Sequence, residues 1–228
     1  MLLGSGCATI GTVQTARPIE RGSWQLGVEQ GVWQSESGSL VPSANVAARL
    51  GVTNRWDLGA RVGTGGVGLS TKLTLTDPDR SLVLSLAPSI GGSSPTMIGG
   101  RSTHAQLPLL VGLGLGPHEL TLTPKIQAWS LAEAPGPRRG RATIIGAGAS
   151  VSTSVRIVRG IRLVPELSVV WPMVGRLQAP VPFRSVELRR GQPVYQATFG
   201  VLLGGERYWW ANRSYRGGYA TFPVWRRW

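Results

Sequence analysis

The feature that most constrains the fold is a strict alternation of apolar residues with polar residues or glycine. In residues 24–29, WQLGVE, every even position is apolar and every odd position is polar or glycine. Because successive side chains of a strand point to opposite faces, this pattern predicts a strand with one apolar and one polar face. The pattern recurs in ten segments: 24–29, 46–52, 56–62, 66–75, 82–86, 105–115, 120–128, 145–156, 161–171 and 195–203.

Composition excludes several competing classes of protein. Glycine accounts for 32 of the 228 residues, which is too many for a helix bundle because glycine destabilises helix interiors. A single cysteine cannot build a disulfide framework or a multi-cysteine zinc site. No run of the chain approaches the roughly 18 apolar residues that a transmembrane helix needs.

The connections between the segments alternate in length. Residues typical of tight turns occur at 53–54, 77–79, 116–118 and 158–160, whereas the connections at 34–44, 91–103, 130–141 and 172–193 are long. The short connection at 63–65 is the exception. Short turns at one end and long loops at the other are typical of outer-membrane barrels, with the turns in the periplasm. The sequence therefore predicts an all-β fold: an antiparallel up-and-down transmembrane β-barrel of about ten strands, located in the cell outer membrane.

Aromatic residues stand at both borders of the apolar faces. Trp24 and Trp56 are at the turn end of their segments, and Trp171 and Tyr195 are at the loop end. Amphipathic rings at both borders form the girdles expected at the two membrane interfaces. The alternative is that they are ordinary strand aromatics.

Four prolines interrupt the strand patterns. Because proline cannot donate a ladder hydrogen bond, we expect bulges or bends at these positions. They are Pro88, Pro108, Pro124 and Pro165.

The polar face of the predicted barrel points into its lumen. Ten strands enclose an interior only slightly wider than side chains can fill, so paired charges are expected to plug it. The alternative is a narrow channel that tolerates anions. The charged residues expected to face the lumen are Glu29, Arg49, Arg55, Asp57, Arg61, Lys72, Lys125, Arg156, Arg162 and Glu166, and the uncharged polar residues expected beside them are Gln25, Gln127 and Gln196.

The two ends of the chain differ from the barrel pattern. Residues 1–22 are interpreted as a truncated signal with a lipobox followed by a periplasmic linker, and 23–204 as the barrel. In the lipobox interpretation Cys7, which follows MLLGSG, carries the lipid; otherwise it is an ordinary thiol. Residues 205–228, rich in aromatic residues and arginine, form either a tail on the inner leaflet or a final hairpin that makes twelve strands.

Three stretches resemble a known family. They are SGC at 5–7, TARP at 15–18 and GVTNRWDLGAR at 51–61. Together they resemble the small outer-membrane β-barrel proteins, often lipoproteins, of Gram-negative bacteria, over roughly residues 7–204. The resemblance implies fold and location and no particular activity.

No enzyme or cofactor is predicted. The histidines, His104 and His118, are too few for a histidine metal site. A lipid-modifying enzyme is the alternative, with Ser102 as nucleophile, His104 as base and Glu133 or Glu187 as the acid. No nucleophile elbow surrounds any serine, which counts against this alternative.

The remaining alternatives concern partners and class. The net charge of +13 is spread over strands, turns and loops without a recognition module, so nucleic acid is not the expected partner. Contact with outer-membrane lipids and lipopolysaccharide explains the arginines better. A soluble cationic β-sandwich is disfavoured by the one-sided alternation. The predicted role is structural or surface interaction without catalysis, with a porin-like channel as the alternative and the oligomeric state left open.

Overall fold

The computed structural model describes residues 13–34, 40–93, 100–133, 141–178 and 192–205. Cys7, Glu187 and residues 206–228, each the subject of a prediction above, lie outside the described residues. No helix in the described ranges is long and apolar enough to cross a membrane.

The described chain is an all-β structure. Its strands are β1 (Trp24–Gln34), β2 (Leu40–Gly51), β3 (Trp56–Gly63), β4 (Gly66–Thr74), β5 (Leu82–Leu86), β6 (Ser89–Ser93), β7 (Gly100–Leu115), β8 (His118–Glu133), β9 (Arg141–Val158), β10 (Ile161–Gln178) and β11 (Val194–Gly204).

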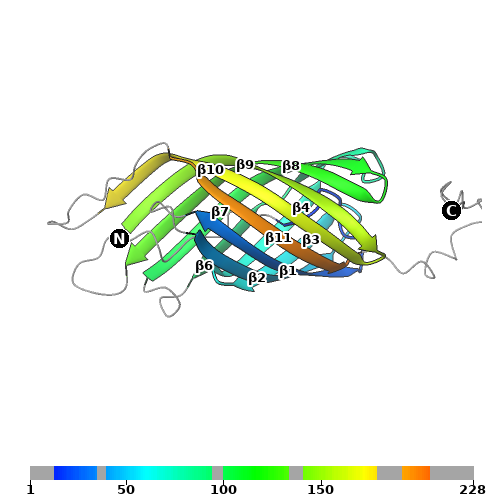
Figure 1. Ribbon diagram of the computed structural model, residues 1–228, viewed down its shortest axis with the longest axis horizontal. Helices are drawn as coiled ribbons and strands as arrows, with labels where there is room; N and C mark the ends of the chain where they lie inside the picture. The colour runs from blue at the N-terminus through cyan, green and yellow to red at the C-terminus, as the bar shows by residue number, and fades with distance from the viewer. Residues whose placement is uncertain (1–12, 35–39, 94–99, 134–140, 179–191, 206–228) are drawn as a thin grey trace, which may run out of the picture.

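These strands form one closed antiparallel sheet. Apart from β5 and β6, which do not pair with each other, strands adjacent in sequence pair with one another, and β1 pairs with β11 to complete the ring (Figure 1). β5 and β6 both lie between β4 and β7 and are two parts of one barrel strand. The prediction of a ten-stranded up-and-down barrel is therefore confirmed, and the ring is complete without residues 206–228.

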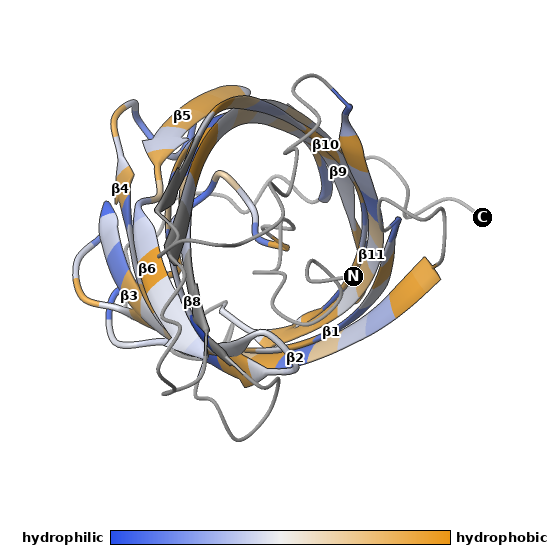
Figure 2. Cartoon of the chain, turned by 90° about the vertical axis from the view of Figure 1, so that its left-hand side faces the viewer, coloured by the Kyte–Doolittle hydropathy of each residue, from blue (hydrophilic) through white to orange (hydrophobic). Residues whose placement is uncertain are grey.

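The two faces of the wall differ as the alternation predicts. In β1, Gln25 and Glu29 point inward and are buried, whereas Leu26 and Val28 point outward and are exposed. The exposed outer face consists largely of Leu, Val and Ile side chains. In Figure 2, hydrophobic residues are coloured orange along the strands. Exposing these side chains to water would be unfavourable, so the outer face is suited to a lipid bilayer.

The prolines interrupt strand pairing without adding a residue. Pro88 separates β5 from β6, yet both parts keep the same register with β7. β7 and β8 likewise keep one register on both sides of Pro108 and Pro124, and β9 and β10 do so across Pro165. The expected bulges are therefore absent at these four positions. A register shift occurs instead between Pro172 and Val174 of β10.

The barrel wall is uneven in height. β9 and β10 contain 18 residues each, whereas β3 contains 8. At about 3.3 Å per residue and a tilt near 45°, 18 residues rise roughly 42 Å, more than the ~30 Å of a hydrocarbon core. The wall formed by β7–β10 is thus taller than a hydrocarbon core, and its extra length lies at the loop end of the barrel.

Candidate functional site

The lumen contains a stretch of its own chain. We call residues 13–21 the N-terminal segment; it precedes β1 and lies inside the ring of strands (Figure 2). Gly22, with φ of 74°, reverses the chain at the turn end, where its N–H donates to the Gly51 carbonyl at 2.8 Å. A left-handed φ favours glycine because it has no Cβ. Residues 13–21, expected as part of a periplasmic linker, lie within the lumen instead.

Apolar contacts hold the N-terminal segment against the wall at two places. Ala16 packs with Val83, Ala87 and Leu110 in a fully buried cluster. Val13 packs with two further inward-facing residues, Val164 of β10 and Leu202 of β11. Each cluster therefore combines the N-terminal segment with strands far away in the sequence.

Glu119 of β8 is one polar anchor of the N-terminal segment. Its Oε1 accepts a hydrogen bond from the Ala16 N–H at 2.6 Å and another from the Thr121 hydroxyl at 2.9 Å. Its Oε2 lies 3.5 Å from Nε of Arg17. The Glu119 side chain is 2% exposed, so this carboxylate would be costly to bury without those donors. The Ser85 hydroxyl donates to the Ala16 carbonyl at 2.6 Å, which fixes both polar groups of the Ala16 backbone.

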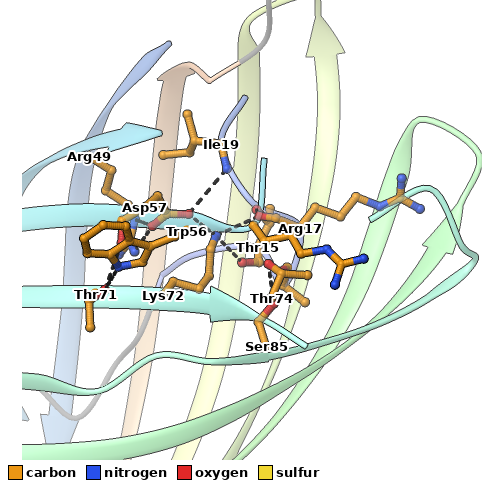
Figure 3. A network of polar contacts seen from close by, with 12 residues as sticks. Thr15, Arg17, Ile19, Arg49, Trp56, Asp57, Thr71, Lys72, Thr74 and Ser85 are labelled. Atoms are coloured by element: carbon orange, nitrogen blue, oxygen red, sulfur yellow. Dashed lines mark hydrogen bonds and ion pairs between the residues drawn. The ribbon is translucent and has the colours of Figure 1, made fainter. Parts of the chain in front are cut away.

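A second anchor is built around Asp57 of β3 and Lys72 of β4 (Figure 3). Asp57 forms ion pairs with Arg49 and, at 3.2 Å, with Lys72, and it also accepts the Ile19 N–H at 3.4 Å. The Lys72 ammonium donates to the Thr15 and Arg17 carbonyls at 3.0 and 2.7 Å. The buried lysine and aspartate thus satisfy each other and bind the backbone of the N-terminal segment on both sides of Ala16.

Glycines on the inward face make room for the N-terminal segment. A Cβ on Gly112 of β7 would lie 2.5 Å from the Ala16 Cβ and 2.9 Å from Oε1 of Glu119. A Cβ on Gly200 of β11 would collide with the Val13 side chain. The absence of side chains at these wall positions is therefore part of the fit.

The charged residues expected in the lumen are not all placed alike. Arg55 is exposed in the turn between β2 and β3, so the expectation that it faces the lumen is not met. The four lumen arginines on strands are half-buried, and the acids and lysines are buried. The half-buried set is Arg49, Arg61, Arg156 and Arg162; the buried set is Glu29, Asp57, Lys72, Lys125 and Glu166, with Gln25, Gln127 and Gln196.

A small cavity adjoins the N-terminal segment. A cavity of about 50 Å³ lies beside the N-terminal segment, with Val13 and Gln14 on one side and Glu29, Arg49 and Arg61 on the other. That volume is sufficient for one or a few water molecules. The cavity is small, and its lining combines the charged side chains of Glu29, Arg49 and Arg61 with apolar residues such as Val13.

The residues predicted at the membrane interfaces lie on the outer face. Trp24, Trp56, Trp171 and Tyr195 have exposed side chains, with exposed fractions between 37% and 60%. The indole N–H of Trp56 donates to the Thr71 hydroxyl. An aromatic residue that the alternation did not single out, Trp33, points inward and is buried.

The described residues contain no arrangement expected of an active site. Ser102 and His104 both face inward, but the Ser102 hydroxyl pairs with Ser93 at 2.7 Å. Neither ring nitrogen of His104 has a hydrogen-bond partner within the described ranges. Nδ1 of His118 accepts the Arg156 N–H. Within those same ranges, no group of three His, Cys, Asp or Glu side chains is placed to hold a metal ion.

The N-terminal segment was not expected from the sequence, although the wall carries a signal of it. Apolar residues stand on the polar, inward face at Val83, Leu110, Val164 and Leu202, where the alternation calls for polar side chains. A buried apolar position inside a polar lumen needs an apolar partner, and here the partners are Val13 and Ala16.

Comparisons with known proteins found structural likenesses of low score. No family model matches the sequence, and no curated protein is similar to it. Neisserial surface protein A is 10% identical over 79% of this chain and 95% of its own, with a TM-score of 0.41. Ail, the attachment invasion locus protein of Yersinia pestis, is 8% identical over 81% and 99%, with a TM-score of 0.39. The N-terminal β-barrel domain of Pseudomonas aeruginosa OprF is 8% identical over 81% of this chain and 98% of its own, with a TM-score of 0.36.

These likenesses are weak, so the architecture rests on the strand pairing itself. An even number of antiparallel strands in a closed ring, an apolar outer face and a polar interior characterise barrels of the outer-membrane type. The chain has all three features and is an outer-membrane β-barrel in architecture.

Proposed function

We propose that the protein resides in the outer membrane and acts at the cell surface as a structural or interaction protein, with a lumen closed by its own N-terminal segment. One observation carries the proposal: the backbone of that segment is bonded to buried charged groups of the wall at Asp57, Lys72 and Glu119. A chain held in this way occupies the route that a solute would take.

The uneven wall supports a role on the loop side of the membrane. β7–β10 extend beyond the hydrocarbon core, and in outer-membrane barrels the longer loops face outward. Such a raised wall offers strand edges and loops to a partner, and outer-membrane lipids and lipopolysaccharide are the surroundings it meets first. Lipidation of Cys7 remains part of this proposal.

Catalysis is not part of the proposed role, because Ser102 and His104 do not form a nucleophile and base pair. A narrow channel that tolerates anions is the competing function. It requires an unobstructed path through the lumen, and the packing of Ala16 and Val13 against the wall argues against such a path.

Two measurements test the proposal on the full chain. Fractionation of cells that express the protein is expected to recover it with outer membranes, and its gel mobility is expected to shift on heating. Recovery in the aqueous fraction without detergent would contradict a membrane location. Purified protein in planar bilayers is expected to give no conductance steps. Regular steps that weaken in Arg61→Glu would favour the channel instead.

A further inference from the structure

The turn end of the lumen holds a second cavity, whose lining includes Arg17 and Glu119 from the contacts that seat the N-terminal segment. Its volume is about 460 Å³, within the range of pockets that bind small organic ligands. One wall is the N-terminal segment, and the other consists of the turn ends of β1 and β8–β11. The cavity therefore exists only while that segment is seated.

Arginine dominates the charge of this cavity. Arg17 contributes from the N-terminal segment, and Arg156, Arg159 and Arg162 contribute from β9, the following turn and β10. The acids in the lining are Glu20 and Glu119, so four positive and two negative charges leave a formal excess of +2 (4 − 2). A phosphate monoester carries about −1.5 to −2 at pH 7 and matches that excess.

Two of the guanidinium groups are held in place by the protein. Nη1 of Arg162 donates to the Pro117 carbonyl at 3.2 Å and lies 3.3 Å from the Ser154 hydroxyl. Nη2 of Arg17 donates to the Arg80 carbonyl at 3.2 Å. A guanidinium carries five N–H donors in a rigid fork that suits phosphate oxygens, and fixing it beforehand lowers the entropic cost of binding.

We propose that this cavity, which we call the arginine pocket, binds the phosphate group of a small organic phosphate and thereby stabilises the seated N-terminal segment. The inward-facing residues Gln25, Glu119 and Arg162 line it, so a ligand reaches it through the turn end of the lumen. Since Arg17 lies on the segment and Arg162 on the wall, a phosphate that contacts both links the two. The inference rests on the seated segment of the proposed function and adds a ligand to it.

Binding is tested with inorganic phosphate on the full-length protein in a nonionic detergent, by calorimetry at constant ionic strength. We expect saturable binding that weakens about tenfold or more in Arg162→Ala and in Arg159→Ala, as loss of a charge-assisted hydrogen bond requires. Arg55→Ala is the matched control, because Arg55 is an exposed turn arginine outside the pocket. A heat-dependent gel shift verifies that each variant folds. Should Arg162→Ala fail to fold, Arg159→Ala, exposed in its turn, retains the test.

The link to the N-terminal segment is tested by hydrogen exchange of the Ala16 and Ile19 amides. A ligand that binds only the seated state reduces opening by the factor 1 + [ligand]/Kd, about elevenfold at ten times Kd. Vesicles of phosphatidylcholine with and without phosphatidylglycerol provide the second arm. If exchange slows only with vesicles that contain phosphatidylglycerol, and this slowing is lost in Arg159→Ala, the phosphate comes from a lipid headgroup. If exchange slows with free phosphate, the ligand is soluble.

The proposal is overturned if neither source binds, or if Arg55→Ala weakens binding as much as Arg159→Ala does. Phosphate binding without any change in exchange of the segment would overturn the link. These outcomes differ from failure of the proposed function, which conductance of the wild-type barrel would reveal whether or not phosphate binds.

Discussion

Replacing Gly112 with alanine adds one methyl group at a tight contact between the wall and the N-terminal segment. The new Cβ would lie 2.5 Å from the Ala16 Cβ, whereas carbon atoms prefer about 3.5–4.0 Å. Ala16 would have to retreat by about 1.0–1.5 Å, which lengthens its two 2.6 Å hydrogen bonds, to Glu119 and from Ser85, beyond ordinary range. Losing a hydrogen bond to a charged group costs about 1.5–3 kcal/mol.

That cost sets the expected size of the effect. We expect Gly112→Ala to raise the unseated fraction of the N-terminal segment about 30- to 150-fold, the equivalent of about 2–3 kcal/mol. Hydrogen exchange of the Ala16 and Ile19 amides, read by mass spectrometry on the folded barrel, measures that fraction directly.

Gly68→Ala is the matched control for this substitution. Gly68 also faces inward, and the nearest atom to its Cβ would be the Ile90 carbonyl oxygen at 3.3 Å, with no atom of the N-terminal segment within 4 Å. Both substitutions remove a strand glycine, so the contacts with Ala16 and with its partner Glu119 distinguish them. Equal exchange in Gly112→Ala and in the wild type would refute the reasoning.

Three further substitutions test other parts of the account. Glu119→Ala removes the acceptor of the Ala16 N–H and is expected to speed exchange of that amide about tenfold or more. Asp57→Asn leaves Arg49 and Lys72 without their carboxylate and is expected to lower the free energy of unfolding in urea by about 3–5 kcal/mol. The control Asp79→Asn, in an exposed turn, is expected to change it little. Val28→Arg places a charge on the outer face near the middle of the wall, and refolding into lipid vesicles should show a loss of about 2–4 kcal/mol, with a smaller loss for Leu50→Arg at the turn end. Equal losses for the two outer-face variants would argue against a spanning barrel.

The wall of the barrel was predictable because each strand carries its own pattern. Val28 and Glu29 occupy opposite faces of β1 because successive residues of a strand point to opposite sides, and the alternation of apolar and polar residues shows which side is which. The strand ends were less predictable. β9 and β10 extend past the predicted segments because strand pairing continues beyond the region where one face must be apolar.

The N-terminal segment could not be predicted by the same reasoning. It has no periodicity, and its contacts are with groups far away in the sequence: Ala16 meets Glu119 across 103 positions, and Ile19 meets Asp57 across 38. The sequence does hold indirect signs, namely apolar residues such as Leu110 and the inward Gly112 on a face that otherwise is polar. These show that something apolar is accommodated in the lumen without identifying it.

The central claim is that residues 13–21 occupy the lumen, and thiol accessibility tests it most directly. In a Cys7→Ser background, Val13→Cys places a smaller side chain at a position that is 6% exposed between Val164 and Leu202, and Asn54→Cys places a thiol in an exposed turn. The account predicts that a maleimide added to the folded barrel labels the cysteine at 54 rapidly and the one at 13 only after denaturation. Equal labelling rates at the two positions would contradict it.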